Sequence, residues 1–308
     1  MTLQQLEYIV AVDRFRHFAK AAEHCHVTQP TLSAMIQKLE EELDAKIFDR
    51  SRQPICPTPA GMGIIEQAKR VLTQAEHIRS IVKEEKHSLA GTFRLGILPT
   101  IAPYLLPRFF PSLLKEHPEM DICVTEMKTA DIKQALQDSE IDAGIVASLA
   151  GMEEFRETIL FYETFYAYVS AESRLSANEV IRTSDLNDEE LWLLDEGHCF
   201  RDQLMRFCQL KSAQTSQQAY RLGSMETFMR MVESGKGTTF IPELAVCQLE
   251  EKQKQLVRPF AIPCPTRKIV WLTRKDYIRQ TLLEAVTQKI RASVPRSMLT
   301  LKPTQTLI

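Results

Sequence analysis

The sequence predicts a small helical domain with a helix-turn-helix and a wing, a long linker helix, and a larger two-lobed α/β domain. Three observations predict this α plus α/β architecture. Residues 1–90 read as successive helices, whereas strands and helices alternate after Gly91. A chain of 308 residues is also long for one hydrophobic core, so more than one domain is expected.

Three helices are predicted within residues 1–58. The first has the amphipathic residues Leu3, Leu6, Ile9, Val10 and Val12. The second is short, spans 18–23 and is rich in alanine. The third begins after Thr28, an N-cap residue, with proline in its first turn. Its predicted apolar side consists of Leu32, Met35, Ile36, Leu39 and Leu43.

A short helix, a tight turn and a second helix with a polar leading edge are typical of a DNA-binding helix-turn-helix. Residues 54–58 would supply a wing that is rich in proline and poor in basic residues. The alternative is a helical hairpin with a solvated polar face. The candidate DNA contacts are Thr28, Gln29, Pro30, Thr31, Ser33, Gln37 and Lys38 on the helix, with Arg50 and Arg52 beside the wing.

The charge of this segment sets a condition on DNA binding. Residues 1–87 hold twelve Lys and Arg against twelve Asp and Glu, although affinity for DNA depends on neutralising phosphates. We therefore expect the acidic run Glu40, Glu41 and Glu42 to lie away from DNA. Tight binding would also need more than one copy of the module.

A long helix is predicted over the linker, residues 59–90. Its apolar positions recur every three to four residues, close to a heptad, from Ile64 to Val82. A lone helix cannot bury such a stripe, so a dimer is expected. The alternative is packing of the stripe against its own domain.

The α/β domain is predicted over 91–294, with lobe I at about 91–160 plus 268–294 and lobe II at about 161–267. Lobe I begins as βαβαβ, and the carboxyl ends of its parallel strands are where ligands bind. Thr100 and Thr129 stand at two such ends, although both can equally be helix caps. Predicted strands are 92–98, 122–126, 143–147, 160–169, 191–194, 220–222, 238–241 and 268–273; predicted helices are 102–115, 131–137, 225–233 and 279–292.

Two lobes of this kind enclose a cleft, as in periplasmic binding proteins. Ser224 is expected to cap the helix that follows it. Residues 295–308 show no period and are expected to form a loosely held tail.

Cys199 lies in a locally electropositive sequence, between His198 and Arg201. Positive charge favours the nucleophilic thiolate, although a buried, unreactive cysteine is the plain alternative. Cys208 is nine positions away, which is roughly 13 Å along a helix, beyond the ~7 Å between Cα atoms that a disulfide tolerates. A disulfide between the two cysteines would therefore remodel the local structure, as a switch does.

Composition narrows the class of protein further. The net charge is −2, and the sequence shows neither a membrane-length apolar run nor a signal peptide, so a cytoplasmic protein without membrane contacts is expected. The seven cysteines form no CxxC pair and no zinc-type cluster, so no metal or cofactor is expected. We expect packing roles for Cys25, Cys56, Cys123, Cys247 and Cys264.

The segments Phe18–Ala22 and Val27–Ser33, with the linker helix and two-lobed domain, resemble LysR-type transcriptional regulators over about residues 3–294. The resemblance implies promoter DNA as ligand, a dimer or dimer of dimers, and RNA polymerase as partner. Leu98–Pro107, and Gly197–Gln203 with Cys208, are similar to the peroxide-sensing members of that family.

That second resemblance implies a redox role for the two cysteines. Hydrogen peroxide would oxidise Cys199 to a sulfenic acid, Cys208 would capture it as a disulfide, and cellular thiols would reduce the disulfide. It implies a peroxide pocket made of Thr100, Thr129, His198, Arg201 and Asp202, with Arg267 stabilising the thiolate.

Two other functions stay open at this point. A metabolite-responsive LysR-type regulator would hold an anionic ligand at the helix N-termini near Thr100 and Ser224, with incidental cysteines. A thiol peroxidase, from a different class, would need catalytic turnover, and the DNA-binding head argues against it.

Overall fold

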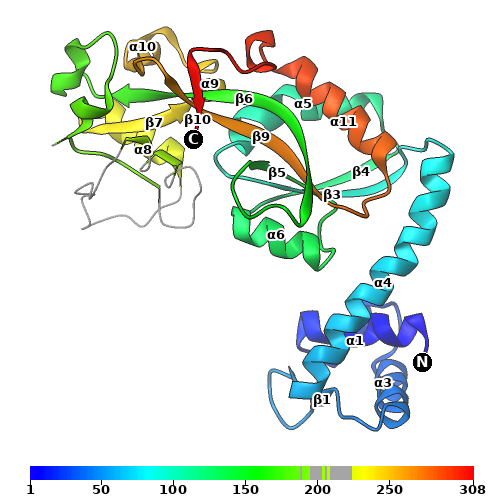
Figure 1. The fold of residues 1–308 in the computed structure, drawn as a ribbon. Helices are drawn as coiled ribbons and strands as arrows, with labels where there is room; N and C mark the ends of the chain where they lie inside the picture. The colour runs from blue at the N-terminus through cyan, green and yellow to red at the C-terminus, as the bar shows by residue number, and fades with distance from the viewer. Residues whose placement is uncertain (188, 195–202, 205–206, 209–223) are drawn as a thin grey trace. The chain divides into compact units, whose positions relative to one another are not determined.

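The computed structural model describes residues 1–308 except 188, 195–202, 205–206 and 209–223 (Figure 1). The chain divides into two compact units, Met1–His87 and Ser88–Ile308. Each unit has its own hydrophobic core and is described by itself.

The amino-terminal unit contains the predicted helix-turn-helix and wing. Its elements are α1 (Leu3–Phe15), α2 (Phe18–His24), α3 (Gln29–Glu42), the antiparallel pair β1 (Phe48–Asp49) and β2 (Cys56–Pro57), and α4 (Pro59–Glu85). The predicted caps are present: the Thr28 hydroxyl accepts a hydrogen bond from the Thr31 N–H, and Pro30 lies in the first turn of α3. Local capping chemistry therefore places the start of α3 where the sequence indicates.

One side of α3 differs from its prediction. Leu32, Ile36 and Leu39 are buried in the core of the unit, but Leu43 is exposed. Leu43 is the C-cap residue of α3, so it follows the last helical turn and no longer faces the core.

The linker helix α4 buries only its first part within this unit. Ile65 and Ala68 are buried, and α4 packs against α1. Farther along, Ile78 is 67% exposed, and Ile81 and Val82 are also exposed. These three side chains share one helical face, so the chain presents an apolar stripe that one copy does not cover.

The carboxy-terminal unit is built on a mixed sheet in the order β4-β3-β5-β9-β6-β7, with β10 paired to β9 and β8 to β6. Its strands are β3 (Gly91–Ile97), β4 (Met120–Glu126), β5 (Ala143–Ala147), β6 (Phe155–Val169), β7 (Thr238–Pro242), β8 (Val257–Pro259), β9 (Cys264–Arg274) and β10 (Gln305–Leu307). Strand β3 pairs in parallel with both β4 and β5, as the βαβαβ pattern predicts.

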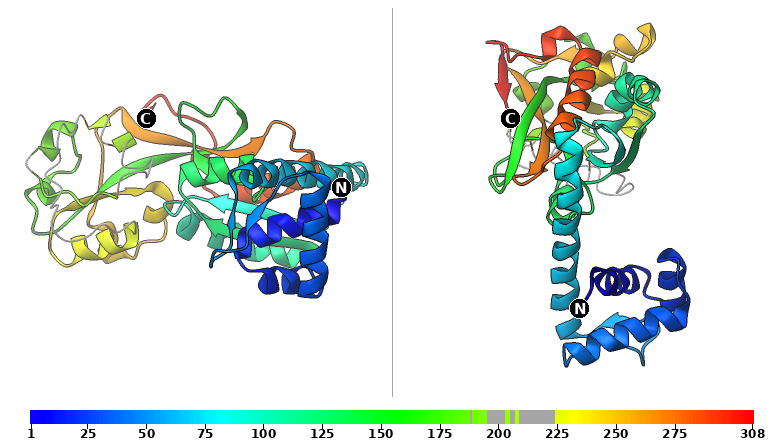
Figure 2. Two further views of the ribbon diagram at one scale, coloured as in Figure 1. Left: turned by 90° about the horizontal axis from the view of Figure 1, so that it is seen from below. Right: turned by 90° about the vertical axis from the view of Figure 1, so that its right-hand side faces the viewer.

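Strands β6 and β9 are longer than predicted and run antiparallel to each other from Phe155↔Arg274 to Thr164↔Thr266 (Figures 1 and 2). The proposed lobe boundaries, at 160/161 and 267/268, fall inside these two strands. The pairing shifts register between Ile159 and Phe161, so Leu160 forms a bulge at that boundary. The lobes therefore share a continuous hydrogen-bonded ladder.

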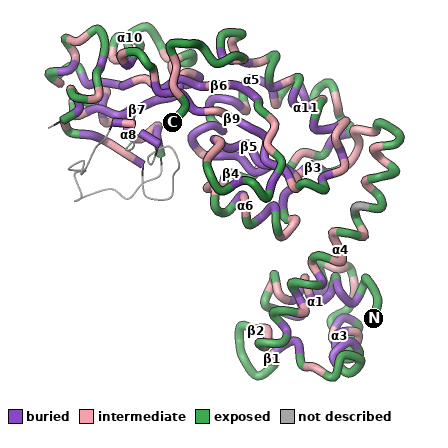
Figure 3. Tube along the Cα trace, viewed as in Figure 1, coloured by how far each residue is buried: buried purple, intermediate pink, exposed green. Residues whose placement is uncertain are grey.

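Helices flank the strands, and buried residues follow the central strands (Figure 3). Trp271 on β9 packs edge-on against Phe93 and donates a hydrogen bond to Thr287 Oγ1 at 2.7 Å. The α-helices are α5 (Ala102–Glu116), α6 (Thr129–Gln137), α8 (Met225–Glu233), α9 (Glu243–Val246), α10 (Glu251–Lys254) and α11 (Gln280–Ser293), with short 3₁₀ turns at Arg174–Ala177, Thr183–Leu186 and Arg296–Met298.

One predicted strand is not found as a strand: residues 191–194 make one isolated bridge, from Leu191 to Thr238. The predicted strand at 220–222 lies outside the described part of the chain. A short apolar run can bury its side chains in the core without pairing with a strand, so its pattern alone does not establish a strand.

The segment 295–308 is ordered against the sheet, contrary to the expectation of a loosely held tail. Strand β10 pairs in parallel with β9, and Gln305 Nε2 donates to Thr164 Oγ1 at 2.8 Å. Met298 is buried. Backbone pairing of three residues needs no apolar period, so the sequence carries no sign of it.

Candidate DNA-binding surface and thiol site

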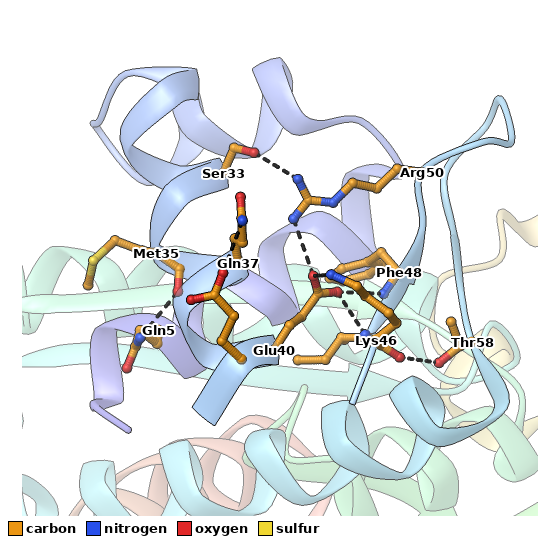
Figure 4. Close-up of polar contacts among 11 residues, drawn as sticks. Gln5, Ser33, Met35, Gln37, Glu40, Lys46, Phe48, Arg50 and Thr58 are labelled. Carbon is orange, nitrogen blue, oxygen red and sulfur yellow. Dashed lines mark hydrogen bonds and ion pairs between the residues drawn. The ribbon is translucent and has the colours of Figure 1, made fainter. Parts of the chain in front are cut away.

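Glu40 connects the recognition helix α3 to the wing (Figure 4). It is 2% exposed, and its Oε1 accepts hydrogen bonds from the N–H groups of Ile47 at 2.8 Å and Phe48 at 3.2 Å. Its Oε2 lies 3.5 Å from Lys46 Nζ and 3.4 Å from Arg50 Nη2. Glu40 is thus separated from the rest of the acidic run, because helical periodicity turns this residue inward while Glu41 and Glu42 stay exposed.

Arg50 lies between the wing and α3. Its Nη1 donates to Ser33 Oγ at 3.1 Å, and its guanidinium carbon is 5.1 Å from the centre of the Phe18 ring. Arg52 is more exposed and pairs with Asp49, Nε to Oδ2, at 3.0 Å. Hydrogen bonds from Ser51 lower the pKa of Asp49, with a smaller contribution from Arg52.

The polar face of α3 carries the other candidate DNA contacts. Thr28, Gln29, Pro30, Thr31, Gln37 and Lys38 are exposed, and Ser33 is half-buried. Gln37 Nε2 donates to Glu41 Oε1 at 3.0 Å (Figure 4). Exposed amide and hydroxyl groups along one helix, with Arg50 beside them, form a surface that can read base edges and contact phosphates.

The sequence-predicted threonines lie at one edge of the sheet in the other unit. Thr100 follows β3, and Thr129 is the first residue of α6, after β4. Because β3 and β4 are parallel neighbours, their carboxyl ends meet at the same edge. Neither hydroxyl is the N-cap of the following helix; those N-caps are Ile101 and Lys128.

Thr100 is bound by Arg267. Arg267 Nη1 donates to Thr100 Oγ1, and Nη2 donates to the Thr100 backbone oxygen, both at 3.0 Å. Both residues are buried, and Arg267 is 0% exposed. The structure thus brings two sequence-predicted residues, from β9 and the β3–α5 loop, into direct contact.

A carboxylate that the sequence analysis missed completes this cluster. Glu163 on β6 is 1% exposed, and its Oε2 is 2.9 Å from Arg267 Nε and 2.7 Å from Arg267 Nη2. Burial raises the pKa of Glu163, whereas the Arg267 guanidinium and the Leu244 N–H oppose that rise. One carboxylate inside the apolar run of β6 is a signal that could have indicated a buried ion pair.

Cys208 is buried, with 4% exposure, in a turn closed by its N–H to the Leu204 carbonyl oxygen at 2.9 Å. Burial raises the pKa of its thiol to about 12. Phe207 packs edge-on against Phe260, and Gln203 Nε2 donates to the Ile308 backbone oxygen at 2.7 Å. Cys199, His198, Arg201 and Asp202 lie outside the described residues.

The remaining cysteines are free thiols. Cys25, Cys56 and Cys264 are half-buried, but Cys123 and Cys247 are exposed, so packing does not account for the latter two. In the described part of the chain, no group of three His, Cys, Asp or Glu side chains is placed to hold a metal ion. No described helix is both long and apolar enough to span a membrane.

Comparisons with known proteins match nearly the whole chain. Residues 3–62 match the profile described as a bacterial regulatory helix-turn-helix protein of the lysR family, and residues 86–295 match the LysR substrate binding domain. A hydrogen peroxide-inducible genes activator of Dickeya chrysanthemi is 34% identical over 274 residues, which are 89% of this chain and 90% of that protein.

Solved structures give the same result. A full-length OxyR variant from Pseudomonas aeruginosa is 36% identical, with a TM-score of 0.77, and the match covers 96% of this chain and 99% of that one. OxyR from Porphyromonas gingivalis is 49% identical, with a TM-score of 0.66, over 71% of this chain and 99% of that one.

Proposed function

Because the chain belongs to the LysR family of bacterial helix-turn-helix regulators, we propose that it is a transcription regulator that responds to hydrogen peroxide. The expected resemblance to LysR-type regulators is confirmed, and the similarity to OxyR extends over most of the chain. The signal, the site residues and the partners below are our proposal.

The DNA ligand is double-stranded promoter DNA. The exposed face of α3 would enter the major groove, and Arg50 and Arg52 would contact phosphates. The DNA-binding domain has no net charge, so tight binding needs several copies of it. A dimer through the exposed stripe of α4, and a dimer of dimers, would supply these copies. The bound regulator would act on RNA polymerase in the cytoplasm.

The peroxide step takes place at Cys199. Its thiolate sulfur attacks one peroxide oxygen, the S–O bond forms as the O–O bond breaks, and the other oxygen leaves as hydroxide that takes up a proton to become water. Thr100, Thr129, His198, Arg201 and Asp202 would surround the reacting oxygens, and Arg267 adds positive charge.

The second step joins the two cysteines. Cys208 sulfur attacks the sulfenic sulfur, a disulfide forms, and the hydroxyl group leaves as water after taking the Cys208 proton. A dithiol of the cell then reduces the disulfide to two thiols and is itself oxidised.

The burial of Cys208 is the observation that supports a redox switch. A thiol that is 4% exposed and stays protonated is a poor nucleophile, so its turn must open before the disulfide forms. Opening moves Leu204 and Phe207 out of the carboxy-terminal core, and this repacking would alter the contacts between protein copies and the spacing of the DNA-binding heads.

A thiol count by mass spectrometry, before and after about one equivalent of peroxide, with a DNase footprint in parallel, tests this function. We expect a Cys199–Cys208 disulfide together with an altered footprint. Seven free thiols and an unchanged footprint would contradict it.

Two further measurements distinguish the proposed function from the two alternatives. A metabolite-responsive regulator would keep its response in Cys199→Ser, whereas we expect that variant to lose it. The bond from Arg267 to Thr100 also engages a hydroxyl that an anionic metabolite would need. A thiol peroxidase would consume many equivalents of peroxide per chain, whereas we expect one per switching event.

A further inference from the structure

Arg279 is a buried cation whose acceptors carry no charge. It is 6% exposed, and its Nη2 donates to the backbone oxygens of Ser88 at 3.1 Å and Ala90 at 3.0 Å. These oxygens are its side-chain hydrogen-bond partners in the described part of the chain, where its Nε is buried without an acceptor. Burying a guanidinium costs free energy that a carboxylate usually offsets, so its position needs a reason beyond stability.

The two acceptors lie at the start of the carboxy-terminal unit. The amino-terminal unit ends at His87, one position before Ser88, and β3 begins at Gly91. Helix α4 ends at Glu85, and His87 has a φ of 50°, in the left-handed region where helices commonly end. Residues 88–90 are therefore the piece of backbone through which the linker helix joins the sheet.

Arg279 holds this piece of backbone to its own unit. Nη2 carries two hydrogens, so this one nitrogen serves the carbonyl oxygens on both sides of Leu89. The Leu89 side chain packs against the core of the carboxy-terminal unit, and the Gly91 N–H donates to the Glu119 backbone oxygen at 3.0 Å. Because residues 88–91 are fixed in this way, rotation of the linker helix is confined to the residues before them, at His87.

The helix that begins at Arg279 reaches the boundary between the lobes. Arg279 is the N-cap of α11, which packs against α5 and β6. In the last turn of α11, Arg291 Nη2 donates to the Ile159 backbone oxygen at 2.6 Å, next to the Leu160 bulge of β6. Helix α11 thus connects the bulge at which the lobes meet to the residue that holds the end of the linker.

We propose that Arg279 is a positioning residue for signal transmission, which couples the carboxy-terminal unit to the linker helix by fixing residues 88–90. With this segment fixed, a movement at the lobe boundary turns α4 about His87. With the segment free, the same movement is absorbed by a slack connection and does not reach the DNA-binding unit. The inference rests on the proposed function, because the redox change supplies the movement.

The test follows DNA binding by full-length Arg279→Gln before and after peroxide, on a promoter duplex that the wild type protects. We expect the variant to form its disulfide as the wild type does, and to bind DNA equally well in the reduced form. We expect its reduced and oxidised footprints to be the same, which is a loss of the response without a loss of either activity. A change of footprint as large as that of the wild type would overturn the proposal.

Hydrogen exchange measured by mass spectrometry on the reduced proteins tests the physical cause. Loss of two hydrogen bonds from a charged donor should accelerate exchange in the peptide covering residues 86–93 by about tenfold or more. Exchange in the rest of the carboxy-terminal unit should stay as in the wild type. Acceleration throughout the unit would make Arg279 an ordinary stabilising residue and would count against coupling, as would unchanged exchange over residues 86–93.

Two further variants serve as controls. Arg258→Gln also removes a guanidinium from backbone oxygens of the same unit, those of Gln255 and Ser176, both at 2.6 Å, and should keep the wild-type footprint change. An equal loss of response in Arg258→Gln would overturn the proposal. If Arg279→Gln does not fold, Leu89→Ala removes the apolar contact of the same segment and should cause the same loss of response; a normal response in Leu89→Ala would then contradict the coupling.

The same data distinguish failure of the proposed function. If the wild type forms no disulfide with peroxide, or keeps the same footprint after forming it, the peroxide switch is wrong. If the wild type responds and Arg279→Gln responds equally, only the coupling role of Arg279 is wrong.

Discussion

The Gln203 side chain donates a hydrogen bond of 2.7 Å to the backbone oxygen of Ile308. Gln203 belongs to the turn that buries Cys208, and Ile308 follows β10, which pairs with β9. The segment that contains Cys208, the cysteine for which we propose a resolving role, is thus connected to a strand that lies beyond the matched substrate binding domain, residues 86–295.

Deleting residues 303–308 should make Cys208 more reactive in the reduced protein. The deletion removes β10 and the acceptor of the Gln203 bond, and a hydrogen bond of this kind contributes about 1 kcal/mol, or about fivefold in the opening equilibrium. Alkylation of Cys208 in native buffer, quantified by mass spectrometry, should accelerate by about fivefold or more. The exposed Lys302→Ala is the matched control, and an unchanged rate in the deletion would show that β10 does not hold this turn.

Replacing Glu40 by alanine should destabilise the amino-terminal unit. The change leaves the buried N–H groups of Ile47 and Phe48 without their acceptor, and each costs about 1–3 kcal/mol. Hydrogen exchange should therefore accelerate over residues 1–87, and DNA affinity should fall. Glu41→Ala, one position along on the exposed face, should change neither; equal effects of the two variants would contradict the role of Glu40.

Arg52→Ala should weaken DNA binding without changing sequence preference. We expect Arg52 to contact a phosphate, so its loss should reduce the slope of log affinity against log salt by about 0.9. Binding isotherms at several salt concentrations, on a target and on a scrambled duplex, measure this. A loss confined to the target duplex would instead place Arg52 at a base.

Raising the pH above about 8.5 should destabilise the reduced carboxy-terminal unit, in part through Cys208. Its thiol pKa rises from 9.0 to about 12 on burial, so the folded state keeps a proton that the unfolded state releases. This contribution is fully present below pH 9 and is lost as pH rises toward 12. Urea unfolding between pH 7 and 10.5 measures the free energy of unfolding at each pH. This free energy should fall less steeply with pH in Cys208→Ala than in wild type, by up to about 1.4 kcal/mol per pH unit.

Ile81→Glu should dissociate the dimer that we propose. Ile81 is exposed on the apolar stripe of α4, so a buried carboxylate at the interface would be unpaired. Sedimentation velocity should show a smaller species, whereas Glu76→Gln, at an exposed position about 140° around α4 from Ile81, should leave the assembly intact. If Ile81→Glu still formed a dimer, the apolar stripe of α4 would not be part of the dimer interface.

Local physics explains which parts of the fold were predictable. The caps of α3, the amphipathic start of α4 and the βαβαβ order of lobe I depend on neighbouring residues, so their patterns appear in the sequence. The full length of β6 and β9, the β10 pairing and the burial of Glu40 depend on partners 6 to more than 100 residues away. No local period records such partners.

The candidate site divides in the same way. By itself the sequence determined the family, the polar face of α3, and the choice of Thr100, Arg267 and Cys208 as candidate site residues. Only the tertiary structure decided that Arg267 bonds to Thr100, that Glu163 holds Arg267, and that Cys208 is buried. The physical reason is that a buried charge is tolerated only next to its partner, and that partner is brought close by the sheet rather than by the sequence.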